Sequence, residues 1–252
     1  MPVKPGAEPF AADGSSTGVL VLHGYSGSPQ GVRDWAQHLA DAGLTVRAPR
    51  LPGHGTSVRE LSMTRWPDYY AAASRALDDL VERCDRVFVM GLSVGGALTL
   101  ALAQERADDI SGIVTVNALI QSDRWEAKYL LPALRFLPSW PGGVGNDIKK
   151  PGQDEGAYDR VSPRALWSVM QAWPQLRSRL PEIELPALVF VSPEDHTVEA
   201  ASSQVIYERL GSADKELVEL PDSYHVATMD NDAPTIFDKS LEFVRRLEGS
   251  DA

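Results

Sequence analysis

Short runs of Val, Leu and Ile alternate along this chain with longer segments whose apolar residues recur at helical spacing. Such alternation is typical of strand-helix units around a parallel sheet, so it restricts the fold more than any other feature of the sequence. The runs have nearly continuous apolar centres, as expected for strands that are covered on both faces. The predicted strands are residues 18–23, 44–48, 86–90, 112–116, 187–191 and 215–220. The predicted fold class is therefore α/β, with a mostly parallel central sheet flanked by helices.

Helix signals occupy four of the remaining segments. Ser28 before Pro29 is typical of a helix start, and Gly43 is typical of a helix end. Three further helices are predicted at residues 66–82, 199–210 and 232–247, where apolar residues recur on one face. These helices would provide the layers that flank the sheet.

The alternation breaks once, after the strand predicted at 112–116. From residue 119 to about 159 no buried strand is evident, although aromatic and aliphatic residues are frequent. A strandless stretch of this length indicates an inserted subdomain or a functional lid. Its apolar residues fit short amphipathic helices over a pocket, and ordinary packing of helices on the sheet is the alternative. We expect one domain, residues 1–252, with an insertion at about 119–165.

Composition excludes several classes of protein. With 24 Lys and Arg against 35 Asp and Glu, the net charge of −11 disfavours nucleic acid as a partner. Cys84 is the only cysteine, so neither an internal disulfide nor a cysteine zinc cluster can form, and a cytoplasmic location is expected. The amino-terminal residues lack the apolar segment of a secretory signal peptide, and the chain has no run of about 18 apolar residues. It is therefore predicted to be neither secreted by means of a signal peptide nor membrane-spanning.

The strongest local motif is Gly-Leu-Ser-Val-Gly-Gly at residues 91–96, between a predicted strand and a helical run. A serine on a tight strand-to-helix turn projects its hydroxyl from the carboxyl end of the sheet, and the glycines allow the close backbone packing of that turn. The following helix directs its amino terminus at the same place, which favours developing negative charge. Ser93 is therefore the predicted nucleophile, and a packing turn that merely contains serine is the alternative.

A serine nucleophile needs a base, and the positions of the histidines discriminate between them. His225 follows the last predicted strand, in a loop that can reach the carboxyl end of the sheet, so it is the predicted base. His38 lies within the first predicted helix, where a surface role is expected. His23 ends a strand and His54 lies in a glycine-rich turn, so structural roles are expected for both.

A carboxylate that orients the imidazole should also follow a strand. Glu194 and Asp195 both follow the strand at 187–191, and we favour Asp195. Asp123 is the rival acid, and Asp222 is interpreted as a turn residue. The tetrahedral intermediate requires N–H donors, for which we predict the backbone amides of Val94 and Tyr25. A simple strand-to-helix turn is the alternative for the loop that carries Tyr25.

The order Ser93, Asp195, His225 is that of α/β-hydrolases, and several segments together resemble the bacterial monoacylglycerol lipase and carboxylesterase branch of this fold. Relative to many members, Tyr25 replaces phenylalanine and Val94 replaces methionine, which affects pocket width rather than the backbone donors. The matching segments are residues 19–29, 51–55, 91–96, 223–226 and 230–232.

The resemblance implies a small cap after residues 112–116, a tunnel for one acyl chain, and a cap glutamate that holds the glycerol hydroxyls. Glu155 matches that glutamate, with a plain surface carboxylate as the alternative. The expected function is hydrolysis of monoacylglycerols or similar single-chain esters, without cofactor or metal. Association with membranes is expected to be no more than transient contact with a lipid surface. A broad carboxylesterase for short to medium acyl esters is the alternative, and a non-catalytic ligand-binding protein is a distant one. The sequence does not indicate an oligomeric state.

Overall fold

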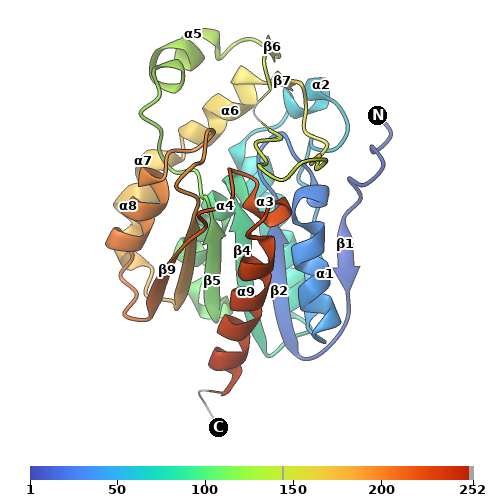
Figure 1. Ribbon diagram of the computed structural model, residues 1–252, viewed down its shortest axis with the longest axis vertical. Coiled ribbons are helices and arrows are strands. Elements are labelled where there is room, and N and C mark those ends of the chain that lie inside the picture. Colours follow the sequence, from blue (N-terminus) through green and yellow to red (C-terminus); the bar gives the residue numbers. More distant parts are fainter. Residues whose placement is uncertain (144, 250–252) are drawn as a thin grey trace.

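The computed structural model describes residues 1–143 and 145–249, which form a central sheet between two layers of helices (Figure 1). The seven strands have the order β1-β3-β2-β4-β5-β8-β9. β1 pairs antiparallel with β3, and every other neighbouring pair in this sheet is parallel. The strands are β1 (Phe10–Ala12), β2 (Thr17–Leu22), β3 (Thr45–Ala48), β4 (Arg86–Leu92), β5 (Gly112–Val116), β8 (Ala187–Val191) and β9 (Lys215–Glu219).

Alternating side chains of the central strands enter two separate cores. Leu20 and Leu22 of β2 pack with residues of α3 (Trp66–Val81), α4 (Val94–Glu105) and α8 (Ala201–Arg209). Val19 and Val21 pack on the opposite face with residues of α1 (Arg33–Asp41) and α9 (Ala233–Glu248). Because helices cover both faces, all six residues of β2 are buried. This explains the continuous apolar runs in the sequence.

The predicted α/β class and the six predicted strands are confirmed. The last of them, β9, is an edge strand with no buried residue, so the expectation that all six are covered on both faces is wrong for it. The helix predicted after Ser28 is divided into a 3₁₀ helix (Pro29–Val32) and α1, with the Ser28 side chain accepting from the N–H of Gln30. The other three predicted helices correspond to α3, α8 and α9. β1 was not predicted, because three residues at an edge of the sheet are too few to show a periodic pattern.

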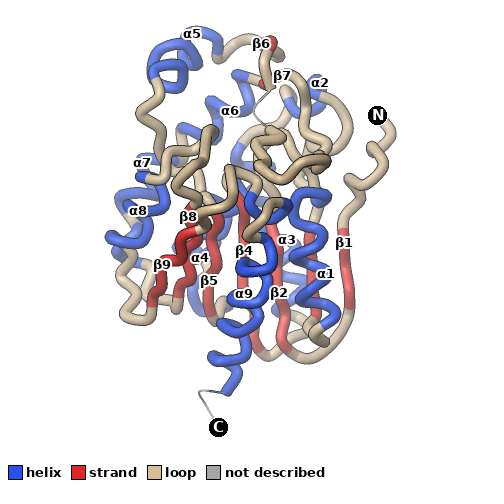
Figure 2. Tube along the Cα trace, in the orientation of Figure 1, coloured by secondary structure: helices blue, strands red, loops and turns tan. Residues whose placement is uncertain are grey.

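Residues 117–186 connect β5 to β8 as an insertion. Its earlier part lies above the carboxyl ends of the strands (Figures 1 and 2), whereas its last helix and the 3₁₀ turn that follows pack beside α4. Outside this insertion, α2 (Val58–Leu61) lies between β3 and α3. The elements of the insertion are a π-helical turn (Glu126–Leu130), α5 (Leu131–Leu134), β6 (Trp140–Pro141), β7 (Arg160–Val161), α6 (Pro163–Met170), α7 (Trp173–Ser178) and a 3₁₀ turn (Leu180–Glu182).

Two tyrosine hydroxyls connect the insertion to the loops below it. The Tyr25 hydroxyl donates to the carbonyl of Ser162 at 2.8 Å and accepts from its N–H at 3.1 Å. The Tyr158 hydroxyl donates to the carbonyl of Gly53 at 2.8 Å and accepts from the N–H of Thr56 at 2.9 Å. Among the described residues, no helix has the length and apolar character needed to cross a bilayer.

Candidate active site

Ser93 occupies the sharp turn between β4 and α4. Its backbone has φ +56° and ψ −115°, a conformation that residues with side chains rarely adopt. Its N–H donates to the carbonyl of Val116 at 2.9 Å, which fixes the turn to the end of β5. The turn also requires glycines, because a Cβ on Gly95 would lie 2.1 Å from the carbonyl oxygen of Leu22 and one on Gly91 would lie 2.2 Å from the carbonyl carbon of Gly95. Local sequence thus places the Ser93 hydroxyl at the carboxyl edge of the sheet.

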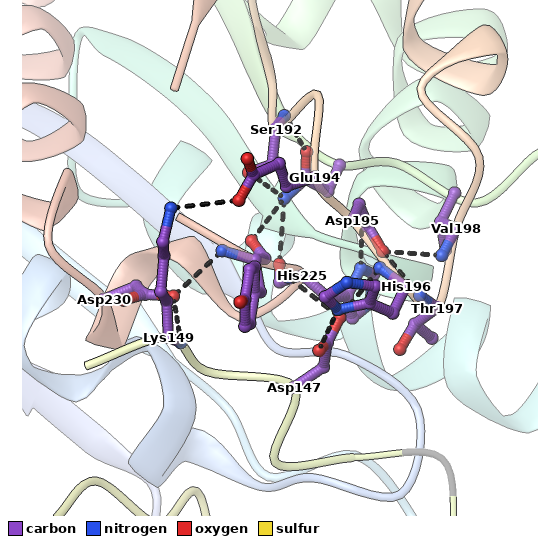
Figure 3. A network of polar contacts seen from close by, with 12 residues as sticks. Asp147, Lys149, Ser192, Glu194, Asp195, His196, Thr197, Val198, His225 and Asp230 are labelled. Atoms are coloured by element: carbon purple, nitrogen blue, oxygen red, sulfur yellow. Dashed lines mark hydrogen bonds and ion pairs between the residues drawn. The ribbon is translucent and has the colours of Figure 1, made fainter. Parts of the chain in front are cut away.

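His225 lies buried in the loop that follows β9, with its ring directed at Asp195 (Figure 3). The two side chains form a hydrogen bond of 2.7 Å between Nδ1 of His225 and Oδ2 of Asp195. Burial by itself would lower the pKa of His225, but the negative charges of Asp195, Glu155 and Asp147 outweigh it and raise that pKa above 6.5. Because Nδ1 is engaged by Asp195, Nε2 is the ring nitrogen left to exchange a proton.

The loop after β8 orients Asp195 from its other side. Its Oδ1 accepts from the N–H groups of Thr197 and Val198, both at 2.7 Å. The carboxylate is 2% exposed, so its charge is screened little by water. Both oxygens therefore have hydrogen-bond donors, and the direction from Asp195 to His225 is fixed by the loop itself.

The structure does not bring the other candidate acids to His225. Glu194 is 55% exposed and forms an ion pair with Lys149 at 2.9 Å. Lys149 also pairs with Asp222 at 3.1 Å, on the surface of the loop. Asp123 is exposed, and its backbone N–H donates to Glu199 at 3.2 Å. Of these four carboxylates, Asp195 alone has a hydrogen bond to His225 among the described residues.

Three other histidines occupy structural positions. His23 is buried, accepts at Nε2 from the N–H of Leu51 at 3.1 Å, and has its pKa lowered to about 3, chiefly by burial. His54 is also buried, and burial lowers its pKa to about 4. His38 lies on α1, 3.4 Å from Asp238 of α9. These positions agree with the roles expected from the sequence.

The two predicted amide donors belong to residues next to Ser93 in the chain or in space. Val94 is the first residue of α4, and N–H groups of a first helical turn have no acceptor within the helix. Tyr25 follows Gly24, where an added Cβ would lie 3.3 Å from the Cβ of Ser93. The loop carrying the Tyr25 amide therefore passes directly beside the serine.

Ser93 and His225 line one cavity of about 680 Å³. Its size lies within the range of small-molecule sites, roughly 300 to 1,000 Å³. The insertion supplies most of the apolar wall, from the π-helical turn, α5, α6 and α7. The residues of this wall are Leu130, Leu131, Leu134, Leu166, Met170 and Trp173.

Glu155 lines the same cavity from the insertion and is 4% exposed. Its Oε1 accepts from the N–H of Asn146 at 2.9 Å, and its own N–H donates to Oδ1 of Asn146 at 2.9 Å. A Cβ on Gly27 would lie 2.7 Å from Oε2, so glycine leaves room for this carboxylate. Burial raises the pKa of Glu155. The surface carboxylate considered from the sequence is therefore wrong.

Sequence reasoning missed Asn146 and Asp147, which also line the cavity. Asp147 accepts from the ring and the backbone of His196 and from the backbone N–H of His225 (Figure 3). The only signal in the sequence was the turn-forming composition of residues 141–147. That signal predicts a turn, but it cannot identify the distant loops that the turn contacts.

Comparison with known proteins places this geometry in a family. Residues 15–232 match the family described as "Serine aminopeptidase, S33". The chain is 40% identical to a thermostable monoacylglycerol lipase of Bacillus sp. (strain H-257), over 98% of each chain. It is 26% identical to a carboxylesterase of Bacillus subtilis (strain 168), over 96% of this chain and 97% of that protein. A solved structure from work on the metagenome-derived lipolytic enzymes LipS and LipT is 42% identical, with a TM-score of 0.92 over 97% of this chain and 100% of that one.

Proposed function

The chain belongs to the Serine aminopeptidase, S33 family. We propose that it is a serine ester hydrolase that cleaves monoacylglycerols to fatty acid and glycerol. The observation that carries the proposal is the shared cavity, which has Ser93 and His225 on its lining, an apolar wall from the insertion and a buried carboxylate. The lipase and carboxylesterase similarities support ester chemistry.

In the proposed mechanism, Oγ of Ser93 attacks the ester carbonyl carbon while Nε2 of His225 takes the hydroxyl proton. Asp195 holds the ring and stabilises the imidazolium. The amides of Tyr25 and Val94 donate to the oxyanion of the tetrahedral intermediate. The intermediate collapses as His225 returns the proton to the departing glycerol oxygen. Water, deprotonated by His225, then attacks the acyl-Ser93 ester and releases the fatty acid.

We propose that residues 119–165 act as a cap over the catalytic centre and that Glu155 accepts hydrogen bonds from the glycerol hydroxyls. Support for the second role comes from its burial and from Asn146, which donates to one carboxylate oxygen, whereas the other has no hydrogen-bond donor in the part of the chain that the structure describes. A cavity of about 680 Å³ suits one acyl chain and a small alcohol better than a triacylglycerol.

The outer side of the same insertion supports transient contact with lipid aggregates. Large apolar side chains there are exposed, whereas their neighbours Leu130, Leu131 and Leu134 face the cavity. Surface apolar groups gathered at a pocket mouth are typical of an interaction site. For the location we propose the cytoplasm, to be tested by cell fractionation. The exposed side chains are Trp125, Tyr129, Phe136 and Leu137, and Trp140 is both exposed and part of the cavity lining.

A panel of esters tests the substrate. We expect the highest kcat/KM for monoacylglycerols, lower values for short alkyl esters and very low values for di- and triacylglycerols and for aminoacyl anilides. Ser93→Ala should reduce kcat/KM by roughly 10⁴-fold or more and abolish labelling by a fluorophosphonate, without loss of folding. Equal rates on mono- and triacylglycerols, or an active Ser93→Ala enzyme, would contradict the proposal. A preference for short alkyl esters would instead favour a broad carboxylesterase, in agreement with the second relative.

Glu155→Gln tests the polar subsite. Because the amide keeps the size of the carboxylate but loses its charge, KM for monoacylglycerols should rise by roughly threefold to tenfold. Values for simple alkyl esters, which have no glycerol hydroxyls, should stay near those of the unaltered enzyme at a pH well above the pKa of His225, where loss of the Glu155 charge does not change the protonation of that ring. Asp154→Asn is the matched control, because it removes the adjacent but exposed carboxylate. An equal change for both ester classes would remove Glu155 from the subsite.

A further inference from the structure

Asp147 connects the insertion to the two loops that carry the candidate acid and base. Its Oδ2 accepts from the N–H of His196 at 3.0 Å and from the N–H of His225 at 3.3 Å. Its Oδ1 is 2.9 Å from Nδ1 of His196, and its carbonyl accepts from the N–H of Val226 at 3.0 Å. One residue of the insertion thus contacts the backbone on both sides of the His225–Asp195 pair (Figure 3).

The residue before it explains how the chain reaches this position. Asn146 has φ +57°, the left-handed conformation that asparagine tolerates better than most residues with a side chain. It binds Glu155 through two reciprocal hydrogen bonds of 2.9 Å. The adjacent Asp147 binds the His225 loop. The Asn146–Asp147 pair therefore braces the buried carboxylate of the cavity and the candidate base at the same time.

An ordinary surface ion pair does not account for these contacts. His196 is 62% exposed, so its interaction with Asp147 would by itself contribute little. Asp147 is only 16% exposed, and it receives backbone N–H groups that a simple pair with the His196 ring would not require. Its placement is explained better by the loops than by the exposed ring.

We propose that Asp147 is a positioning residue for the reaction, which fixes the His225 loop against the Asp195 loop and contributes negative charge beside the His225 ring. This inference rests on the proposed function, since it assigns Asp147 to the same hydrolytic centre. It makes the insertion a part of the catalytic framework as well as a wall of the cavity. Motion of residues 145–147 would then alter base alignment and the polar subsite together.

The charged groups around the site define what the residue adds. His225 faces the carboxylates of Asp195, Glu155 and Asp147, all of which raise its pKa. Lys149, a cation two positions after Asp147, is engaged by Glu194 and Asp222. The Arg124 guanidinium donates to the backbone carbonyl of His196. The ring of Tyr224 packs edge-on against His196 at 4.4 Å.

Asp147→Asn separates charge from shape, because the amide oxygen can still accept from both N–H groups. The readout is kcat/KM against pH for a soluble chromogenic monoester. The acid limb of the profile should move to lower pH by roughly half a unit to one unit, because His225 loses a nearby negative charge. Asp147→Ala also removes the acceptor, so its kcat at the plateau should fall further, by roughly tenfold relative to Asp147→Asn. KM for this small ester should change little in either variant.

Glu194→Gln provides the matched control. It removes the same charge from the adjacent loop, but Glu194 is 55% exposed and is paired with Lys149. Its acid limb should coincide with that of the unaltered enzyme. Asp147→Glu keeps the charge, so the acid limb of its pH profile should lie at the same pH as in the unaltered enzyme even if kcat is reduced. If Asp147→Asn is not recovered folded, Asp147→Ser supplies the same neutral comparison.

The outcomes separate this inference from the proposed function. A shift of the limb in the neutral Asp147 variants, absent in Glu194→Gln, supports the inference. An unmoved limb in an active Asp147→Asn enzyme, or equal shifts in Asp147→Asn and Glu194→Gln, overturns it. A fall in melting temperature with an unmoved pH profile would show a merely structural residue and also overturns it. Failure of the proposed function would appear differently, as an unaltered enzyme that hydrolyses no ester.

Discussion

Replacement of Tyr25 by phenylalanine should destabilise the protein through one hydroxyl group. That hydroxyl lies between the sheet and the insertion, where it donates to the carbonyl and accepts from the N–H of Ser162. Tyr25 is 8% exposed and Ser162 is completely buried. The pKa of the Tyr25 phenol lies far above its usual range, chiefly because of burial and further because of neighbouring tyrosines. The phenol therefore keeps its proton and remains a hydrogen-bond donor.

Loss of the Tyr25 hydroxyl affects the carbonyl and the N–H of Ser162 differently. The Ser162 carbonyl also accepts from the N–H of Leu166 at 3.0 Å and keeps that partner in the variant. For the Ser162 N–H, the phenol is the only hydrogen-bond partner among the described residues. Leaving one buried donor unpaired costs about 1–3 kcal/mol. For a chain of this length a loss of about 2 kcal/mol lowers the melting temperature by roughly 4–8 °C.

Thermal unfolding followed by circular dichroism or calorimetry measures this effect. Tyr129→Phe is the control, because it removes the same atom from a side chain that is 65% exposed. The Tyr25 amide is unaltered in the variant, so kcat should be preserved within a few-fold. A melting temperature within about 2 °C of the unaltered protein would refute the reasoning, since the unpaired N–H would then cost less than the lower limit expected for burial.

Two further perturbations test the turn at Ser93 and the buried histidines. Gly95→Ala should prevent folding, because its Cβ would lie 2.1 Å from the carbonyl oxygen of Leu22, and the measurement is loss of soluble protein. Gly249→Ala should be neutral, because a Cβ at this position meets no atom of the described residues within 4 Å. Acid should destabilise the protein below pH 6.5, because His23 and His54 have folded-state pKa values of about 3 and about 4 and the unfolded chain binds more protons in that interval. Urea unfolding at pH 7, 6 and 5 should show a loss of up to about 2.7 kcal/mol per pH unit, which is reduced by His225 and Glu155 because their raised pKa values act in the opposite direction. A gain in stability between pH 6 and pH 5 would contradict the burial of the His23 and His54 rings as neutral groups.

Ser93 shows how far a local pattern extends. Residues 91–96 predict the turn because its geometry depends on backbone approaches within a few residues, and those approaches permit only glycine. The histidine and acid candidates could be ranked because carboxyl ends of parallel strands meet at one edge of a sheet. The choice between Glu194 and Asp195 was weaker, since neighbouring residues on one loop differ only in the direction of their side chains.

The insertion shows where such patterns end. Its apolar residues indicated a cover over a pocket, but the sequence did not indicate β6, β7, α6 and α7, which occupy the connection between β5 and β8. Glu155 was assigned by resemblance, whereas its burial depends on Gly27 and Asn146 from two different loops. For Asp147 the sequence predicted a turn but not the contacts, because its partners lie about 50 and 80 positions further along the chain.

The sequence alone therefore determined the fold class, the core strands and the turn that carries Ser93. These features follow from periodicity and from steric limits on a few neighbouring residues. Tertiary structure alone decided that Asp195 rather than Glu194 reaches His225, that Glu155 is buried, and that Asp147 joins the insertion to the base loop. Those results depend on the direction of side chains across loops that meet only when the sheet has formed, and hydrogen bonds of about 3 Å are sensitive to shifts that no sequence pattern records.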